Sequence, residues 1–186
     1  MIRSFSAAKI FQETDTAFEH AENLVLEREG CRAAQYDRYT PLARNNFCKG
    51  MPENIIALIE GMTAPAAFSK ESEIFKAGDF GQSLFLVLKG EVEIRLYTCE
   101  RIYKRLAKYG PGTYFGEIAF LIPGPRAASA FVTQDAEIME IDREEIMALA
   151  HDAKADLALY LLYEIGGTLG QELRRSAADI QRLEQW

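Results

Sequence analysis

The spacing of apolar residues changes along the chain, and the changes mark its organisation. Thr16–Glu29 has apolar residues at helical spacing, begins with a capping-box sequence and stops at Gly30, so it predicts a helix. Residues 31–50 have no clear period and predict an irregular linker. Pro52–Ile59 predicts a second short helix, because proline is favoured in a first turn. We therefore expect residues 1–50 to form an N-terminal helical segment and linker.

From Ala64 the apolar residues recur at every second position, which is the period of a strand. Leu84–Leu88 is a continuous apolar run, typical of a buried strand, and Lys89–Gly90 is expected to turn the chain after it. The other expected strands are Ala66–Phe68, Ile74–Phe75, Val92–Leu96, Tyr103–Ala107, Ala130–Val132 and Ile138–Ile141. Short strands separated by glycine turns predict a mainly β fold with flanking helices, a sandwich or jelly roll, over about residues 64–141.

After Asp142 the helical period returns. Arg143–Ala150 predicts one helix, and Ala155 to about Gln185 predicts a longer one with an apolar stripe along it. Gly166–Gly167 interrupts the longer helix, where each glycine costs about 1 kcal/mol relative to alanine. Two interpretations stay open for this pair: close packing against the β roll or a partner helix, and a hinge.

Composition limits the classes of function. The apolar fraction of 48% suits a globular domain, and the net charge of −7 argues against a nucleic-acid-binding face. No apolar run approaches the ~20 residues that cross a bilayer. The N-terminus lacks a secretory pattern, and Cys31, Cys48 and Cys99 show no pairing motif, so free thiols in the cytoplasm are expected.

No catalytic or metal-binding constellation is evident in the sequence. His20 and His151 lie far apart, so the ligand cluster of a metal-dependent β-roll enzyme is missing. No general acid–base pair or activated nucleophile is visible either. We therefore expect a binding protein rather than an enzyme, with no metal.

The segment Phe115–Ser129 carries the candidate chemistry. Glu117 can accept hydrogen bonds from sugar hydroxyls, and Arg126 offers a fork of donors that matches a phosphate. Gly116 allows close approach to the backbone. Residues Glu117–Ile122 can form one short helical turn before Pro123, and the N–H groups at its start would face an anion. A sugar phosphate fits these groups.

Phe115–Ser129 also resembles the phosphate-binding cassette of cyclic nucleotide-binding domains. Gly78–Asp79, Leu84–Val92 and Gly110–Gly112 are similar to the segments that precede the cassette in that family. The resemblance covers roughly residues 52–186. It implies a double-stranded β-helix, or jelly roll, with a short cassette helix.

By this resemblance, residues 51–186 are a cyclic nucleotide-binding domain with C-terminal helices at about 143–185. Arg126 would bind the cyclic phosphate, Glu117 the ribose 2′-hydroxyl, and nearby backbone N–H groups would complete the site. The implied ligand-binding residues are Phe115, Gly116, Glu117, Ile118, Ala119, Arg126, Ala127 and Ala128. The ligand is cyclic AMP or cyclic GMP, and no other cofactor is implied.

The base is less closely specified. Family members that prefer cyclic GMP usually have threonine or serine directly after the arginine, so Ala127 favours cyclic AMP. Ile94 and Leu96 are candidates for an apolar floor under the base. A cap from the C-terminal helix is common in the family; the aromatic candidates, for which ordinary packing is the alternative, are Tyr160, Tyr163 and Trp186.

The resemblance implies a regulatory sensor that signals through movement of its C-terminal helices. The apolar stripe on the long helix also predicts a homodimer. The chain ends about one helix beyond the β roll, so we expect no nucleic-acid partner. The alternative is a fold of this family that has lost its ligand and acts as an interaction or dimerisation module.

The N-terminal region has a resemblance of its own. Residues 2–5 and 15–23 are similar to the closing helix of STAS domains in bacterial sulfate permease-type transporters, some of which carry a cyclic nucleotide-binding domain at their C-terminus. This implies the cytosolic tail of a membrane transporter. An ordinary amphipathic helix before a stand-alone sensor is the alternative.

Overall fold

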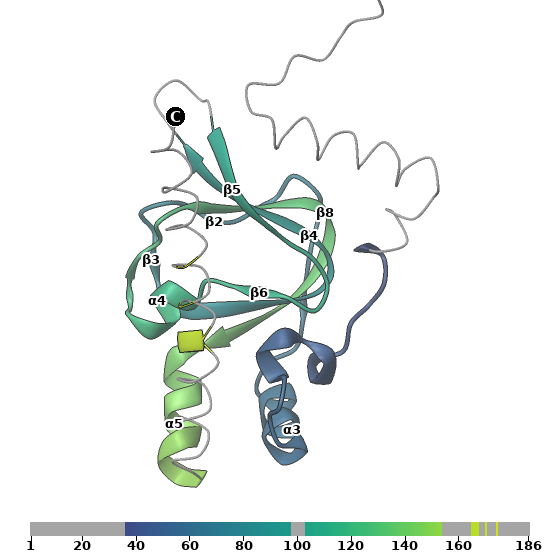
Figure 1. Cartoon of the computed structure of the whole chain (residues 1–186), viewed down its shortest axis with the longest axis vertical. Helices are drawn as coiled ribbons and strands as arrows, with labels where there is room; N and C mark the ends of the chain where they lie inside the picture. Colours follow the sequence, from purple (N-terminus) through teal and green to yellow (C-terminus); the bar gives the residue numbers. More distant parts are fainter. Residues whose placement is uncertain (1–35, 98–102, 154–164, 168–169, 171–173, 175–186) are drawn as a thin grey trace, which may run out of the picture.

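Two long antiparallel strands, β4 (Ser83–Tyr97) and β8 (Ser129–Asp142), form the centre of the architecture. The computed structural model describes residues 36–97 and 103–153, together with 165–167, 170 and 174. In Figure 1 these strands curl into a roll, with β2 and β5 along its upper side, β6 along its lower side, and helices α3 and α5 below it.

All strand pairs of the roll are antiparallel. One half of β8 pairs with β1 and the other half with β2, while β4 pairs with β6 and with β5 in the same way. A separate two-stranded ladder joins β3 to β7. The bounds are β1 (Ala66–Phe68), β2 (Glu73–Phe75), β3 (Phe80–Gly81), β5 (Tyr103–Tyr109), β6 (Tyr114–Phe115) and β7 (Gly124–Pro125). The mainly β, jelly-roll fold predicted from the sequence is therefore confirmed.

The expected turn at Lys89–Gly90 was wrong, because β4 continues through it. Gly90 has φ +86°, and the register between β4 and β8 shifts on both sides of it. A bulge of this kind bends a strand without ending it. The predicted strands at 84–88 and 92–96 are thus the two halves of one bent strand, and those at 130–132 and 138–141 both lie within β8.

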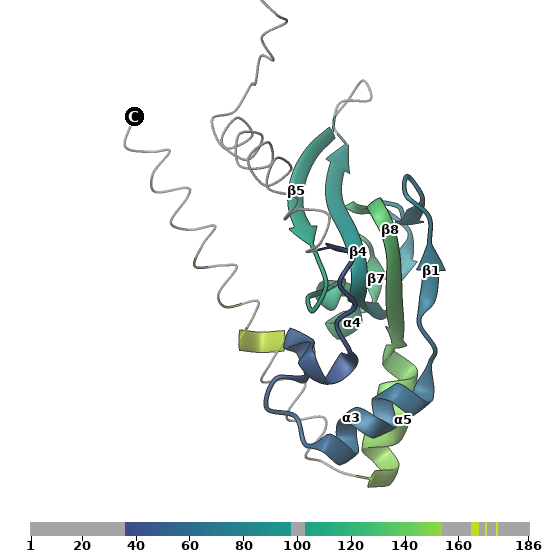
Figure 2. The same ribbon diagram turned by 90° about the vertical axis from the view of Figure 1, so that its right-hand side faces the viewer.

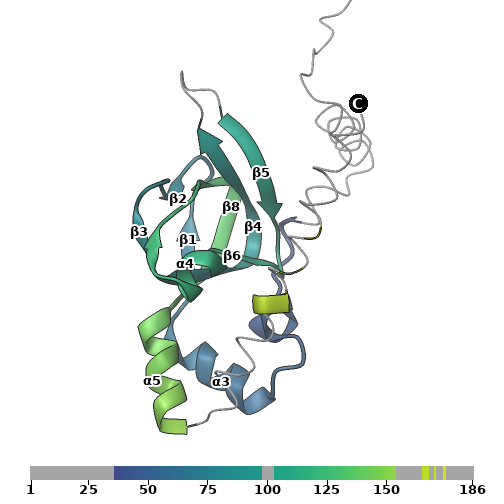
Figure 3. The same cartoon turned by 60° about the vertical axis from the view of Figure 1, so that its left-hand side comes forward.

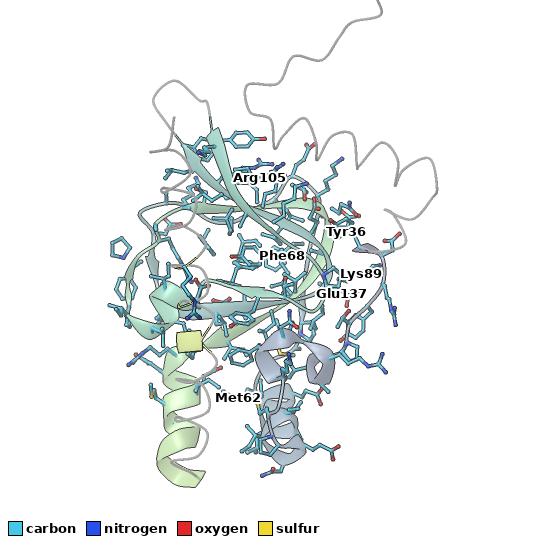
Figure 4. All side chains as sticks on the ribbon, viewed as in Figure 1. Tyr36, Met62, Phe68, Lys89, Arg105 and Glu137 are labelled. Carbon is cyan, nitrogen blue, oxygen red and sulfur yellow. The ribbon has the colours of Figure 1, made fainter. Side chains whose placement is uncertain are left out.

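The apolar run at 84–88 has a simple explanation in the packing. Leu84, Leu86 and Leu88 contribute to the core that faces the helices, whereas Phe85 and Val87 contribute to the core inside the roll. Because side chains alternate along a strand, a strand buried on both faces needs a continuous apolar run. Figure 4 shows Phe68 inside the roll and Met62 at the helical end.

The helices close one end of the roll. α3 (Glu53–Met62) and α5 (Arg143–Ala153) confirm the two helices predicted near these positions. Figures 2 and 3 show both helices beyond the same end of the roll. Ile56 and Ile59 of α3 and Ile146 of α5 are buried in the same core as Leu84. Burial of that apolar surface contributes roughly 1.5–3 kcal/mol for each of these side chains.

The expectation of an irregular linker was wrong for residues 41–48. They form two 3₁₀ turns, η1 (Leu42–Arg44) and η2 (Asn46–Cys48), and Phe47 is fully buried. Between them the amide of Asn45 donates to Thr113 O at 3.0 Å, and its Oδ1 accepts from Phe47 N at 3.0 Å. These turns therefore belong to the core at the helical end.

The polar face of β4 is also buried. The alternation of apolar and charged residues over 91–96 predicted instead that this face would be exposed to solvent. Glu91 and Glu93 are 2% and 7% exposed. Glu93 pairs with Arg95 at 2.8 Å and with Lys108 at 3.6 Å, and Glu91 accepts from Thr133 Oγ1 at 2.6 Å. Buried carboxylates are tolerated when they are paired in this way.

Several sequence-based expectations concern residues that the structure does not describe. The helix at 16–29, the thiols of Cys31 and Cys99, and most of the long C-terminal helix lie outside the described residues. Of that helix, residues 165–167 are helical, and Ile165 is fully buried in the core at the helical end. Gly166 and Gly167 are exposed, and a Cβ on either would meet no described atom within 4 Å, so neither packs closely against the described part of the β roll.

Cys48 is a free, buried thiol. Burial, reinforced by the charge of Glu60, raises its pKa to about 12. The thiol form is therefore favoured, which makes Cys48 a small apolar core residue rather than a nucleophile.

Gly90→Ala tests the bend in β4. A Cβ there would lie 2.3 Å from Asp135 O and 2.6 Å from the Ala136 Cα, and the backbone angle is left-handed. We expect a loss of about 3 kcal/mol or more in the free energy of unfolding, measured by urea denaturation. Gly78→Ala is the control, because φ is +90° there but no atom lies within 4 Å, so a loss of about 1 kcal/mol is expected. Equal losses would show that the bend does not depend on close approach at Gly90.

Candidate functional site

The segment that carries the candidate chemistry forms a short helix on the side of the roll. β6 leads into Gly116, whose φ of +86° turns the chain into α4 (Glu117–Leu121), which confirms the expected cassette helix. A Cβ on Gly116 would lie 3.0 Å from Arg126 Nη1 and 3.1 Å from Ser83 O. Gly116 thus supplies both the turn and the space that Arg126 occupies.

A cavity of about 530 Å³ lies beside α4. Ligand pockets of drug-sized molecules commonly have 300–1,000 Å³. One wall comes from the cassette and includes all eight of the residues predicted to bind ligand. The rest of the lining comes from Phe75 of β2, Ile94 of β4, and the β5 residues Leu106, Ala107 and Tyr109.

Arg126 lines this cavity and is held there by several contacts. Its backbone N–H donates to Asp79 O at 2.8 Å, and its own carbonyl accepts from Gly78 N at 2.8 Å. Its guanidinium donates from Nη1 to Gly116 O at 3.2 Å and from Nη2 to Ser83 O at 3.0 Å. Two of the five N–H donors of the side chain are used in this way.

Arg126 also packs against two aromatic rings. Its Cζ lies 4.3 Å from the ring centroid of Phe75 and 5.2 Å from that of Phe85. The residue is only 7% exposed. Burial lowers the pKa of the guanidinium, and the charges of Glu140 and Glu117 oppose that change. Arginine is so strong a base that its side chain remains a cation here, now in a poorly hydrated place.

Glu117 is the first residue of α4 and is also 7% exposed. It lines the cavity together with Ile118 and Ala119. The N–H groups of a helix's first turn have no partner within the helix, so they are available to acceptors. The site therefore combines a carboxylate acceptor, a cation and backbone donors from the cassette with an apolar lining from β2, β4 and β5.

The predicted base contacts are met in part. Ile94 lines the cavity, but Leu96 is not among the described lining residues and is 39% exposed. Leu96 lies close to the end of β4, where the strand extends past the cavity. The aromatic cap candidates Tyr160, Tyr163 and Trp186 lie outside the described residues.

Sequence reasoning missed the wall formed by Phe75 and β5. The strand at 103–107 was expected, but not which of its residues would face the ligand. The register between β4 and β5 shifts between Ile94 and Arg95, where Ile94 pairs with Ala107 and Arg95 with Arg105. Leu106 falls at this shift and lines the cavity. The apolar residues of β5 were the available signal, but a bulge cannot be located from spacing alone.

The described residues include neither a metal-binding cluster nor a membrane-spanning helix. No group of three or more histidine, cysteine or acidic residues could hold a metal ion. No helix there is long and apolar enough to cross a membrane.

Comparison with known proteins identifies the relatives of this architecture. The profile of the family described as "Cyclic nucleotide-binding domain" matches residues 65–152. The "Cyclic AMP receptor protein" of Thermus thermophilus is 39% identical over 92 residues, covering 46% of this chain and 43% of that protein. The "CRP-like cAMP-activated global transcriptional regulator" of Mycobacterium tuberculosis is 27% identical over 135 residues, covering 73% and 58%.

Among solved structures, the catabolite activator protein of Thermus thermophilus superposes with a TM-score of 0.66 at 26% identity. The superposition covers 75% of this chain and 63% of that protein. The chain spans about half the length of the two regulators named above.

Proposed function

We propose that this chain, whose residues 65–152 form a cyclic nucleotide-binding domain, is a sensor that binds cyclic AMP in the cavity beside α4. The domain is a ligand-binding regulatory domain and not an enzyme, as the family and its relatives indicate. The observation that carries the proposal is the buried cation of Arg126 in the lining of a cavity that Glu117 also lines.

The phosphate is the first part of the ligand to consider. A cyclic phosphodiester has one negative charge and two exocyclic oxygens, which suit the free donors of the Arg126 guanidinium. A charge-assisted hydrogen bond contributes about 1.5–3 kcal/mol. The low exposure of Arg126 supports the higher end, because a poorly hydrated cation gives up little water when an anion binds.

Other lining residues of the cavity would bind the ribose and the base. The carboxylate of Glu117 can accept a hydrogen bond from the 2′-hydroxyl, which deoxyribose lacks. Ile94, Leu106 and Ala107 offer apolar contacts to a purine. Ala127, which lines the cavity directly after Arg126, has no hydroxyl for the guanine 2-amino group, so we propose cyclic AMP over cyclic GMP. The nucleotide is the only small molecule that this proposal needs.

Signalling is proposed to pass to the C-terminal helices. Ile165 is buried in the core that also contains Phe120 of α4. A shift of α4 would therefore change the packing around Ile165 and displace the helix that contains it. A ligand shifts such an equilibrium only by its differential affinity for the two positions of the helix. The same helix carries the apolar stripe, and we propose that two copies of the chain form a homodimer by pairing along it.

The partner controlled by the sensor is also a proposal. The similarity of residues 2–5 and 15–23 to the end of STAS domains supports regulation of an attached membrane transporter, with the sensor on the cytoplasmic side. One relative is named a transcriptional regulator, so the absence of a nucleic-acid partner stays a prediction. Salt-dependent binding of duplex DNA would contradict it.

Arg126→Ala tests the phosphate contact. Loss of this partner should weaken cyclic AMP binding by about 2–5 kcal/mol, or roughly 30-fold to several-thousand-fold, in a calorimetric titration. Arg44→Ala, a change at an exposed arginine of η1, is the control and should leave binding unchanged. Thermal unfolding without ligand shows whether the variant is folded. Tight binding that survives in folded Arg126→Ala, or no binding of either cyclic nucleotide to the wild type, would favour the interaction-module alternative.

Ala127→Thr tests the choice of base. The added hydroxyl should strengthen cyclic GMP binding relative to cyclic AMP by about 0.5–1.5 kcal/mol, or roughly two- to tenfold. Ala67→Thr on β1 adds the same group at an exposed position outside the cavity and should leave the ratio of the two affinities unchanged. A ratio that is the same in both variants would assign base selection to residues outside the cassette.

Sedimentation tests the homodimer. Because the apolar stripe predicts helix pairing, a dimer is expected at micromolar concentration in the presence of cyclic AMP. A monomer at high concentration, both with and without ligand, would exclude dimerisation through this helix.

A further inference from the structure

The side chain of Arg126 lies directly against the backbone of a glycine, Gly81. Gly81 lies in β3, the short strand paired with β7, and β7 ends directly before Arg126. A Cβ on Gly81 would lie 2.2 Å from Arg126 Nε, 2.5 Å from Cζ and 2.9 Å from Cδ. No side chain can share that space with the arginine as it stands.

The guanidinium lies among contacts from Ser83, Gly116, Phe75 and Gly81, and this set of contacts is called the seat of Arg126 below. Its two hydrogen-bonded carbonyls, Ser83 O and Gly116 O, come from β4 and from the turn before α4. The ring of Phe75 lies under the guanidinium, and the bare backbone of Gly81 lies against Nε and Cδ. The side chain is thus contacted on several sides, by two carbonyl oxygens, an aromatic ring and a glycine backbone.

Backbone geometry does not explain why residue 81 is a glycine. The described glycines with positive φ are at positions 50, 78, 90, 112 and 116, and Gly81 is not one of them. Alanine would therefore fit the backbone of β3. The atoms that a Cβ would displace belong to the far end of a flexible side chain and not to the main chain. The space left by Gly81 serves the position of Arg126.

We propose that Gly81 is a positioning residue for the ligand, because it leaves room for the seat in which Arg126 is preorganised to receive the phosphate. This inference rests on the proposed function and deepens it. A donor fork that is already placed loses little conformational freedom when the anion binds. Two cavities adjoin Arg126: the one beside α4, and a second of about 590 Å³ lined by Gly81, Gln82 and Glu140. A Cβ at residue 81 would move the guanidinium out of the seat and misalign it with the phosphate site.

The test uses Gly81→Ala and a control from the same ladder. Gly124 pairs with Gly81 across β3 and β7, and a Cβ on it would meet only Ile122 O, at 3.8 Å. Gly81→Ala should weaken cyclic AMP binding by about ten- to a hundredfold, the equivalent of one charge-assisted hydrogen bond, while Gly124→Ala should bind as the wild type does. In an Arg126→Ala background, Gly81→Ala should have no further effect, because the two residues act through one contact.

A second measurement needs no ligand. The Nε–H signal of Arg126 in ¹H–¹⁵N spectra of the full chain, assigned by its loss in Arg126→Lys, reports the seat directly. We expect slow exchange with water in the wild type and in Gly124→Ala, and fast exchange in Gly81→Ala. If the wild type bound neither cyclic nucleotide, the proposed function would fail. These spectra would still show whether Gly81 holds the Arg126 guanidinium in place.

Several outcomes would overturn the inference. Unchanged or tighter cyclic AMP binding in Gly81→Ala would show that the seat does not prepare Arg126 for the ligand. An equal loss in Gly124→Ala would assign the effect to the ladder as a whole. A loss that persists in the Arg126→Ala background would assign it to contacts other than Arg126, and an unchanged Nε–H signal in Gly81→Ala would show that the guanidinium is not displaced.

Discussion

The placement of one buried cation, the guanidinium of Arg126, is the constraint on which the site depends. A charge that is 7% exposed needs partners, and here they are carbonyl oxygens and aromatic faces. The carbonyls of Ser83 and Gly116 satisfy two donors without neutralising the charge. A cation held in this way keeps a strong attraction for an anion, which is the property that a phosphate site needs.

The long strands of the roll supply the parts of that environment. Ser83 begins β4, and Phe85, two residues on, turns its ring toward Arg126. β4 pairs with β6 at Phe85 and Phe115, so the same strand also positions the entry to α4. The bulge at Gly90 then bends β4, and the second half of the strand contributes Ile94 to the lining of the cavity. One strand thus contributes both to the seat of the arginine and to the apolar lining.

The sequence was informative where the signal is local. The cassette helix, the jelly-roll class and the place of Glu117 and Arg126 in one cavity could be predicted, because they depend on short motifs and on alternation. The bend at Gly90 could not, since it depends on close approach to Asp135 and Ala136 on another strand. The burial of residues 41–48 likewise depends on distant partners, such as Thr113 for the side chain of Asn45.

A crystal structure of the chain with cyclic AMP tests the central claim most directly. The account predicts the nucleotide in the cavity beside α4, with a phosphate oxygen within about 3 Å of the Arg126 guanidinium and the 2′-hydroxyl within the same distance of Glu117. The guanidinium should stay against Gly81, Ser83 O and Gly116 O. A nucleotide bound elsewhere, or a phosphate out of reach of Arg126, would contradict the account.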